Sequence, residues 1–241
     1  MQVGFIGSGN MATALARGWG EPVLCTDSGS GRAARLVAEL GGEALSNAEL
    51  FERADLVMLC HKPSQLADVA EPAFPGTVVS VLGGVTLAEL QAAYPSATVF
   101  RIEPNTPVEL RRGVIVFAAS EARGGDEVKA LFTRVGTVIE MPERLLEVAG
   151  AISGVGPAYW ALLAEAWTDA AVRHGMPAAQ AATLVRETMA GTAELLATTD
   201  TLALRRGVTS PGGSTARGLD ELERGGVRTA LSNAMDAVVS G

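Results

Sequence analysis

The residues with the clearest chemical use lie at the start of the chain, where glycines follow a short apolar run. Gly7, Gly9 and Ala12 have the spacing G-x-G-x-x-A, which connects a buried strand to a helix in dinucleotide-binding proteins. The first glycine permits a tight turn, the second permits close approach of a pyrophosphate, and Ala12 permits close packing of helix on strand. The N–H groups that begin the helix face the phosphates. The motif predicts a dinucleotide site; a tight turn without a ligand is the alternative.

A second apolar run ends in polar residues that suit the adenosine end of a dinucleotide. Asp27 stands twenty residues after Gly7, the distance at which an acid commonly binds ribose hydroxyls, and this favours NADH. Ser28, Ser30 and Arg32 follow, and their hydroxyls and guanidinium could instead hold a 2′-phosphate. We expect NADPH to be preferred over NADH, provided that Asp27 turns away from that phosphate.

Another glycine-rich segment, Thr209–Thr215, opens a helix near the end of the chain. It combines a Pro-Gly turn, two glycines and two hydroxyl side chains directly before the helix. Successive N–H groups in such a segment form an anion-binding nest that would suit a carboxylate. A capped helix after a turn explains the same residues equally well, so the pattern by itself leaves both interpretations open.

Few side chains are available for acid–base or metal chemistry. The chain has only two lysines, two histidines and two cysteines: Lys62, Lys129, His61, His174, Cys25 and Cys60. No His and Cys cluster has the spacing of metal ligands, so we expect no bound metal. Both cysteines fall in predicted strands, where buried thiols of a reducing compartment are expected.

Composition and charge exclude several classes of partner. The chain has 241 residues, is 48% hydrophobic and carries a net charge of −8. So acidic a chain lacks the basic patches that nucleic acids and anionic membranes require, and neither is expected as a partner. We expect no signal peptide, no apolar run long enough to span a bilayer and a cytoplasmic protein.

The elements that must position these residues alternate between strand and helix up to residue 142. Strands are expected at 2–6, 23–26, 54–60, 77–82, 99–101, 114–118 and 135–140, with helices between most of them. This alternation predicts a doubly wound parallel α/β sheet of Rossmann type, whose ligands bind beyond the carboxyl ends of strands. His61 and Lys62 lie at such an end, near the glycine-rich turn, and are expected to contact the cofactor. Gly83 and Asn105 lie at other strand ends.

After residue 142 the pattern is helical throughout, which predicts a second, all-helical domain over 143–241. Its helix at 157–174 is apolar nearly all round, interrupted by Glu165 and Asp169. A domain of roughly ninety residues has little interior in which to bury such a helix. We expect a homodimer to cover it; a monomer with this helix wedged between the domains is the alternative.

Taken together, these motifs resemble the pyrroline-5-carboxylate reductase family of proline biosynthesis, over essentially the whole chain. The resemblance rests on Gly4–Met11, Lys62-Pro63, Gly84–Thr86, Pro104–Pro107, Ser153–Tyr159 and Ser210–Thr215. The last segment is specific to the family, whereas many dehydrogenases share the first. The resemblance implies a Rossmann-type domain over 1–142 that binds NADPH or NADH. It also implies a helical domain over 143–241 that builds an intertwined homodimer, often assembled further into a ring.

The resemblance also implies roles for individual residues. The cofactor would contact Ile6, Gly7, Ser8, Gly9, Asn10, Met11, Asn47, Cys60, His61, Lys62, Pro63, Val81, Leu82 and Gly83. The substrate carboxylate would be held in the segment from Ser210, by Gly213, Ser214 and Thr215. Thr215 would also lie near the ring nitrogen and is the one residue expected to act in catalysis. The chain departs from the family's usual residues at His61, Glu103, Val155 and Gly207, which leaves open the cyclic imine that is reduced.

Hydride reduction of a cyclic imine is compatible with a chain that has so few lysine, histidine and cysteine side chains. A protonated imine is already electrophilic, so it needs orientation against the nicotinamide and an anchor for its carboxylate more than a general acid. β-Hydroxyacid dehydrogenases begin with a similar glycine motif but use a lysine on the helix that joins their domains, and no lysine follows Lys129 here. Another imine reductase and a non-catalytic NAD(P)-binding regulator are further alternatives.

Overall fold

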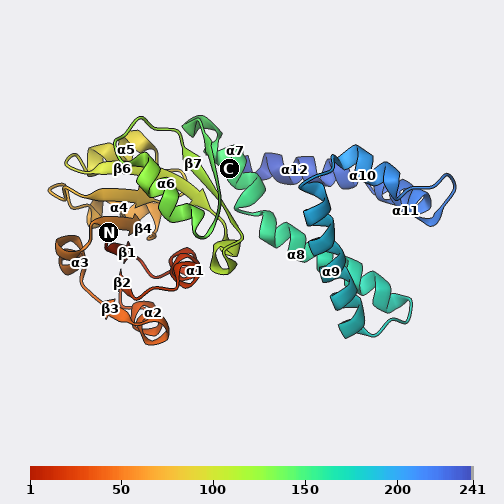
Figure 1. The fold of residues 1–241 in the computed structure, drawn as a ribbon, viewed down its shortest axis with the longest axis horizontal. Helices are drawn as coiled ribbons and strands as arrows, with labels where there is room; N and C mark the ends of the chain where they lie inside the picture. The colour runs from red at the N-terminus through yellow and green to blue at the C-terminus, as the bar shows by residue number, and fades with distance from the viewer. Residues whose placement is uncertain (240–241) are drawn as a thin grey trace. The chain divides into compact units, whose positions relative to one another are not determined.

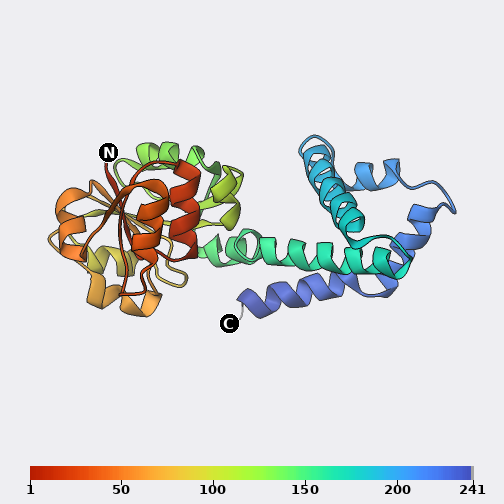
Figure 2. The ribbon, with the colours of Figure 1, turned by 90° about the horizontal axis from the view of Figure 1, so that it is seen from below.

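The computed structural model describes residues 1–239, and its contacts divide the chain into two compact units, Met1–Pro157 and Ala158–Gly241. The first unit contains an eight-stranded sheet with helices on both of its faces (Figures 1 and 2). Its strands are β1 (Val3–Ile6), β2 (Val23–Thr26), β3 (Gly42–Ala44), β4 (Leu56–Leu59), β5 (Thr77–Ser80), β6 (Thr98–Pro104), β7 (Gly113–Ala118) and β8 (Gly136–Met141). Its helices are α1 (Asn10–Trp19), α2 (Arg32–Leu40), α3 (Asn47–Arg53), α4 (Leu66–Val69), α5 (Leu87–Ala93), α6 (Gly125–Thr133) and α7 (Leu146–Ser153), with 3₁₀ turns η1 (Pro63–Gln65), η2 (Thr106–Leu110) and η3 (Glu143–Leu145).

The strand order is β3-β2-β1-β4-β5-β6-β7-β8, and every neighbouring pair is parallel except β6 and β7. This confirms the predicted doubly wound sheet. The exception has a simple cause, because the short η2 connection cannot make the crossover of a dozen or more residues that a parallel pair requires. The order reverses between β1 and β4, which is where an open α/β sheet forms its ligand crevice.

Alternating side chains on the central strands build a core on each face of the sheet. Phe5 and Met58 pack with buried residues of α1, α2 and α6, whereas Ile6 and Val57 pack with residues of α3 and α5 on the other face. Strands covered on both faces are expected to be continuously apolar, as these are. Because helices pack on both faces of the sheet, the carboxyl ends of β1 and β4 are held side by side at one edge of it.

Two details near α3 were not fixed by the sequence pattern. The short edge strand β3 was not predicted, because its three residues carry no apolar alternation, and they are exposed in the structure. It pairs with β2 because Gly42, at φ +102°, lacks the side chain that would collide with Val23. Ser46 caps α3, in a reciprocal pair of hydrogen bonds with Glu49.

A buried arginine ties α7 to the sheet. The Arg101 side chain, 4% exposed, lies 2.8 Å from Glu147 and 3.2 Å from Glu143 through its guanidinium nitrogens, and 3.5 Å from Glu103 on its own strand. Burial raises the pKa of Glu103. This side chain, which stands where the family usually has another residue, therefore belongs to a structural ion-pair cluster.

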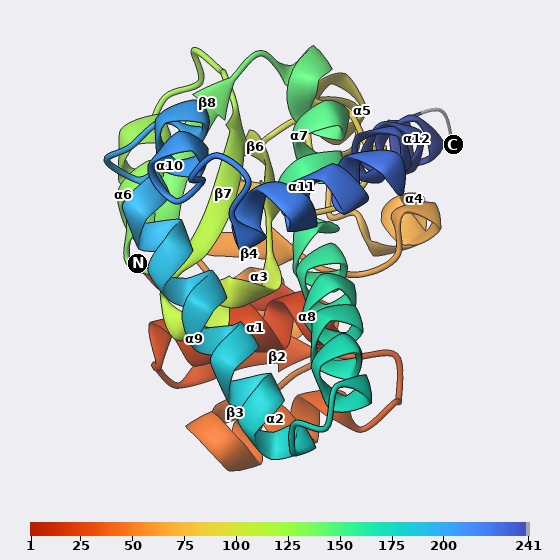
Figure 3. The same ribbon diagram turned by 90° about the vertical axis from the view of Figure 1, so that its right-hand side faces the viewer.

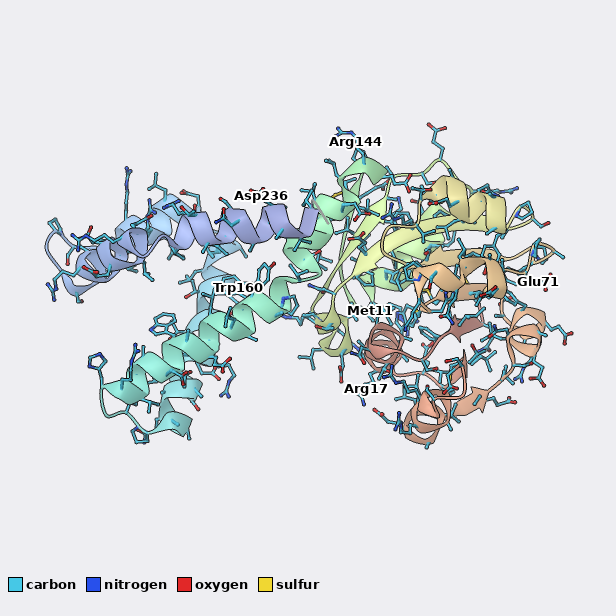
Figure 4. All side chains as sticks on the ribbon, turned by 180° about the vertical axis from the view of Figure 1, so that it is seen from behind. Met11, Arg17, Glu71, Arg144, Trp160 and Asp236 are labelled. Atoms are coloured by element: carbon cyan, nitrogen blue, oxygen red, sulfur yellow. The ribbon has the colours of Figure 1, made fainter. Side chains whose placement is uncertain are left out.

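The second unit consists of α8 (Gly156–Arg173), α9 (Ala178–Leu196), α10 (Thr201–Gly207), α11 (Ser214–Arg224) and α12 (Val227–Val239) (Figure 3). Over residues 158–239 the only buried apolar side chains are those of Ala181 and Val185. Trp160, labelled on α8 in Figure 4, is 60% exposed, and Trp167 is 58% exposed. Apolar surface on this scale marks an interaction face.

One helical stretch, Glu143–Arg173, has the length and apolar composition of a helix that could cross a membrane. Those two properties alone also fit a helix that another protein chain covers. The stretch carries Glu165 and Asp169 in its C-terminal third, and charged groups are costly inside a bilayer. We therefore interpret it as a surface for a second copy of the chain.

We expect the chain to form a homodimer through these helices. Light scattering at micromolar concentration should give at least twice the chain mass of 24.8 kDa. Trp160 and Trp167 are seven residues apart on one face of α8, and each buried side chain of this size contributes about 1.5–3 kcal/mol. The double variant Trp160→Glu, Trp167→Glu should lose the dimer.

The matched control is Leu110→Glu, because Leu110 is a 77% exposed apolar residue on η2 of the first unit. It should remain dimeric. A stable monomer of the wild-type chain would overturn the interpretation of the exposed helices as a dimer surface.

Candidate functional site

A cavity of about 440 Å³ lies at the carboxyl ends of β1, β2 and β4 in the first unit. Its volume is in the range of small-molecule sites. Its walls are Ile6, Gly7, Ser8, Gly9, Thr26, Asp27, Ser28, Ser30, Arg32, Asn47, Cys60, His61, Lys62, Gln65 and Val69. The cavity therefore brings together residues from four separate segments that the sequence assigned to the cofactor.

The two glycines of the first motif have different structural roles. Gly7 has φ +95°, and a Cβ atom there would lie 2.8 Å from the carbonyl oxygen of Cys60. A Cβ atom on Gly9 would meet nothing closer than 3.9 Å, so this glycine leaves open space. Gly7 is therefore required by the fold, and Gly9 provides room for a ligand.

The start of α1 is open to an anion. Gly9 occupies the N-cap position, and among the described residues no side chain caps this helix. The first backbone bond of the helix joins the Thr13 N–H to the Gly9 carbonyl, so the N–H groups before Thr13 are available to phosphate oxygens. Beside them, the buried Ser8 hydroxyl donates to the Thr26 carbonyl at 2.9 Å and fixes the turn against the end of β2.

The Asp27 carboxylate is occupied by its own loop. It accepts hydrogen bonds from the N–H groups of Ala33 (2.8 Å) and Gly29 (2.7 Å) and from the Ser30 hydroxyl (3.2 Å). These bonds, with that of Ala33 the strongest, hold the pKa of Asp27 below its usual range. Asp27 therefore caps α2, while Ser28 and Arg32 beside it are exposed on the cavity wall.

The segment after β4 supplies one unusual group to the cavity. His61 Nδ1 lies 2.9 Å from the Lys62 carbonyl oxygen, and because a carbonyl only accepts, this nitrogen carries the hydrogen. Nε2 is shielded from solvent and has no hydrogen-bond partner among the described residues. Burial lowers the pKa of His61, so its ring is neutral at pH 7. Burial raises the pKa of the neighbouring Cys60 thiol to about 12, which leaves that thiol neutral as well.

Taken together, these features fit a dinucleotide. The glycine turn forms a cradle with space above Gly9, and the start of α1 offers N–H groups. Over residues 1–239, no group of three or more His, Cys, Asp or Glu side chains could hold a metal ion.

Some residues assigned to the cofactor lie off the cavity wall: Asn10, Met11, Pro63, Val81, Leu82 and Gly83. Asn10 lines a neighbouring groove, and the Met11 side chain packs against the core. Leu82 is buried in the core below the sheet edge, so only its backbone is available at the surface. The contacts of these six residues with a cofactor stay predictions.

Three other wall residues, Thr26, Gln65 and Val69, had no cofactor role predicted from the sequence. Ser30, also on the wall, was predicted only as a possible ligand of the 2′-phosphate. Gln65 accepts a hydrogen bond from the Lys62 N–H at 3.2 Å in the η1 turn. Its three-residue spacing from Lys62 after a proline is the signal that could have identified it. Asn105, expected at a strand end, directly follows β6; it donates to the Ser153 carbonyl and accepts from the Val114 N–H, which joins β6, β7 and α7.

The Ser210–Thr215 segment lies in the second unit, directly before α11. Gly212 has φ +68°, the Gly213 N–H donates to the Ser210 carbonyl at 3.0 Å, and Gly213 occupies the N-cap of α11. Within the described chain no side chain caps this helix either, so the N–H groups of Ser214 and Thr215 are available. Arg217 donates to the Gly212 carbonyl at 2.9 Å and steadies the turn.

Comparison with known proteins supports a cofactor-binding first unit and a helical second region. Residues 143–240 match the family described as pyrroline-5-carboxylate reductase dimerisation, and residues 2–84 match the one described as NADP oxidoreductase coenzyme F420-dependent. A pyrroline-5-carboxylate reductase of Synechocystis is 38% identical over 200 residues, which are 79% of this chain and 75% of that protein.

Solved structures extend the likeness over the whole chain. The 1-pyrroline-5-carboxylate reductase of Streptococcus pyogenes has a TM-score of 0.91 at 28% identity, covering 100% of this chain and 97% of that one. The Plasmodium falciparum pyrroline carboxylate reductase with NADP bound has a TM-score of 0.88 at 26% identity, covering 100% and 96%.

These likenesses confirm the Rossmann-type fold, the NAD(P) cofactor and the helical dimerisation region, which implies a homodimer. The chain belongs to the pyrroline-5-carboxylate reductase family.

Proposed function

We propose that this chain reduces 1-pyrroline-5-carboxylate to L-proline, with NADPH as the preferred hydride donor. The observation that carries the proposal is the presence, on a chain of this family, of two open helix starts. One lies beside the dinucleotide cavity at Gly9 and the other follows the Ser210–Thr215 turn. The first suits a pyrophosphate and the second a carboxylate.

The cofactor supplies the hydride, and the first unit supplies its binding site. Gly7 and Gly9 bring the backbone close to the pyrophosphate, and Asn10 and Met11 offer N–H groups from the start of α1. Ser28 and Arg32 bind the 2′-phosphate, because Asp27 is turned into its own loop and does not face that phosphate. We also propose that the remaining predicted residues, Asn47, Pro63, Val81, Leu82 and Gly83 among them, line the cofactor.

The substrate is bound through its carboxylate. The N–H groups of Ser214 and Thr215 hold this anion, and Gly213, whose N–H donates to the Ser210 carbonyl, shapes the turn from which they point. The Thr215 hydroxyl forms a hydrogen bond to the ring nitrogen and so orients the imine for hydride transfer. No ionisable side chain is required in this segment, because the protonated imine is already electrophilic.

We further propose that the dimers assemble into a ring, that the enzyme works in the cytoplasm and that the functional boundary between cofactor and substrate domains follows residue 142. The resemblance to the family supports the ring, and the acidic, cysteine-poor composition supports the compartment. The start of the matched dimerisation region at residue 143 supports the boundary. The last two residues of the predicted domain 143–241, residues 240 and 241, lie outside the described part of the chain.

The glycine cradle predicts different results for two alanine variants. Gly7→Ala should destabilise the protein by about 1–3 kcal/mol, because its Cβ would press on the Cys60 carbonyl at a positive φ. Gly9→Ala should leave the melting temperature within about 2 °C of wild type, since its Cβ meets open space. It should nonetheless weaken NADPH binding at least tenfold, measured by fluorescence titration. Full NADPH affinity in Gly9→Ala would exclude a pyrophosphate above this residue.

The exposed guanidinium of Arg32 on the cavity wall predicts the cofactor preference. Arg32→Ala should lower kcat/KM with NADPH by about tenfold to a hundredfold, as expected for charge-assisted hydrogen bonds of about 1.5–3 kcal/mol, and change the value with NADH less than twofold. Arg123→Ala, which removes an exposed guanidinium away from the cavity, is the charge-matched control. Equal losses with both cofactors would show that Arg32 does not bind the phosphate.

Steady-state kinetics test both the proposed reaction and the carboxylate site at Ser210–Thr215. A panel of pyrroline and piperideine carboxylates and a 3-hydroxy acid, assayed with both cofactors, should show turnover of 1-pyrroline-5-carboxylate above the others. Thr215→Ala should lower kcat/KM by about tenfold to a hundredfold, because one oriented hydrogen bond and its stranded partner are lost. NADPH affinity should be unchanged.

Two further variants make this test specific to the nest. Gly213→Val should be more damaging than Thr215→Ala, since a side chain at Gly213 would collide with the Ser210 hydroxyl. Thr209→Ala should change kcat/KM less than twofold, because the Thr209 hydroxyl already donates to the Arg205 carbonyl. Wild-type kinetics in Thr215→Ala would identify the segment as a helix cap only.

A further inference from the structure

A groove of about 290 Å³ lies between α1 and α2, beside the dinucleotide cavity. The two hollows share Ser8 and Arg32 as wall residues, so they adjoin each other. The other wall residues of the groove come from one side of each helix: Asn10, Thr13, Arg17, Arg35, Leu36 and Glu39. The groove is therefore a side chamber of the cofactor cavity.

This groove concentrates positive charge on an acidic chain. Its wall carries the three arginines Arg17, Arg32 and Arg35 against one carboxylate, whereas the whole chain has a net charge of −8. Arg17, labelled in Figure 4, is already paired, because its guanidinium donates to Glu39 at 2.7 Å and to Glu109 at 2.9 Å. The side chains of Arg32 and Arg35 are exposed, and neither forms an ion pair or a hydrogen bond with another described residue. Two guanidinium groups in the groove are therefore available to an anion.

The two available guanidinium groups stand one helical turn apart on α2. Arg32 is the first residue of this helix and Arg35 follows three positions later, a spacing that makes side chains neighbours on a helix surface. On the α1 side of the groove, the Asn10 amide and the Thr13 hydroxyl are uncharged hydrogen-bond donors. A phosphate monoester carries a charge of about −1.5 to −2 near neutral pH and has three acceptor oxygens. Two guanidinium groups match that charge, whereas one neutralises only part of it.

We propose that the groove is a phosphate-monoester subsite, in which Arg35 acts with Arg32 as a second guanidinium on the adenosine 2′-phosphate of NADPH. Arg35 is then a specificity-determining residue, because NADH has a hydroxyl where NADPH has this phosphate. The Asp27 carboxylate does not compete for either guanidinium, since it accepts hydrogen bonds from the N–H groups of its own loop. The inference rests on the proposed cofactor site.

Titration of the dimeric protein with each cofactor, in the absence of substrate, tests the second guanidinium. Arg35→Ala should weaken NADPH binding about tenfold, the loss expected for one charge-assisted hydrogen bond, and weaken NADH binding less than about twofold. Arg35→Lys keeps the charge but loses the planar fork, so its NADPH affinity should fall between those of wild type and Arg35→Ala. Arg35→Glu places a like charge beside the phosphate and should weaken NADPH binding further, without a matching loss for NADH.

The charge-matched control is Arg123→Ala, which removes an exposed guanidinium that lines neither hollow. It should leave both affinities unchanged. Equal losses with both cofactors in Arg35→Ala, or unchanged NADPH binding in that variant, would overturn the inference.

Fragments of the cofactor locate the contact on the ligand. In competition with NADPH, 2′-AMP carries the monoester alone and ADP carries the pyrophosphate alone. Arg35→Ala should weaken 2′-AMP binding about tenfold and leave ADP binding unchanged. A loss for ADP equal to that for 2′-AMP would place Arg35 on the pyrophosphate and refute the subsite.

Failure of this inference is distinguishable from failure of the cofactor site. A wild-type protein that bound neither NADH nor NADPH would refute the cofactor site itself. A selective loss of NADPH binding in Arg32→Ala but not in Arg35→Ala would refute only the role of Arg35.

Discussion

The close approach of the turn after β1 to the end of β4 is the constraint on which the cofactor site depends. The Gly7 backbone passes the Cys60 carbonyl at a distance that excludes any side chain. This contact closes the sheet edge at the point where the strand order reverses. Gly7, Gly9, Cys60 and His61 all line the cavity at this point, so this contact helps to shape its wall.

Polar groups at this edge divide into those that hold the scaffold and those left for a ligand. The Ser8 hydroxyl and the Asp27 carboxylate are both used locally, by the Thr26 carbonyl and by the loop before α2. Arg32, by contrast, is exposed on the cavity wall. The locally bonded groups shape the cavity, and exposed side chains such as Arg32 can contact a molecule that binds there.

The two units obtain their stability in different ways. The first buries apolar side chains on both faces of its sheet and ties α7 to it through Arg101. The second has almost no interior over residues 158–239, and its tryptophans lie largely exposed. Helices without a core of their own gain their hydrophobic stabilisation from association. The apolar helices of the second unit therefore gain most of their burial when the dimer forms.

Local sequence patterns determined the strands, most helices, the glycine turn and the apolar face of α8, because each depends on periodicity or on the conformational freedom of one residue. The tertiary structure decided what depends on contacts between distant segments. The antiparallel β6–β7 pair and strand β3 follow from connection length and from Gly42 beside Val23. The position of Asp27 in the sequence predicts a contact with the ribose, but in the structure its carboxylate accepts hydrogen bonds from the N–H groups of its own loop. His61 gained its unpaired acceptor only because folding shields Nε2, and no sequence pattern encodes what surrounds a side chain.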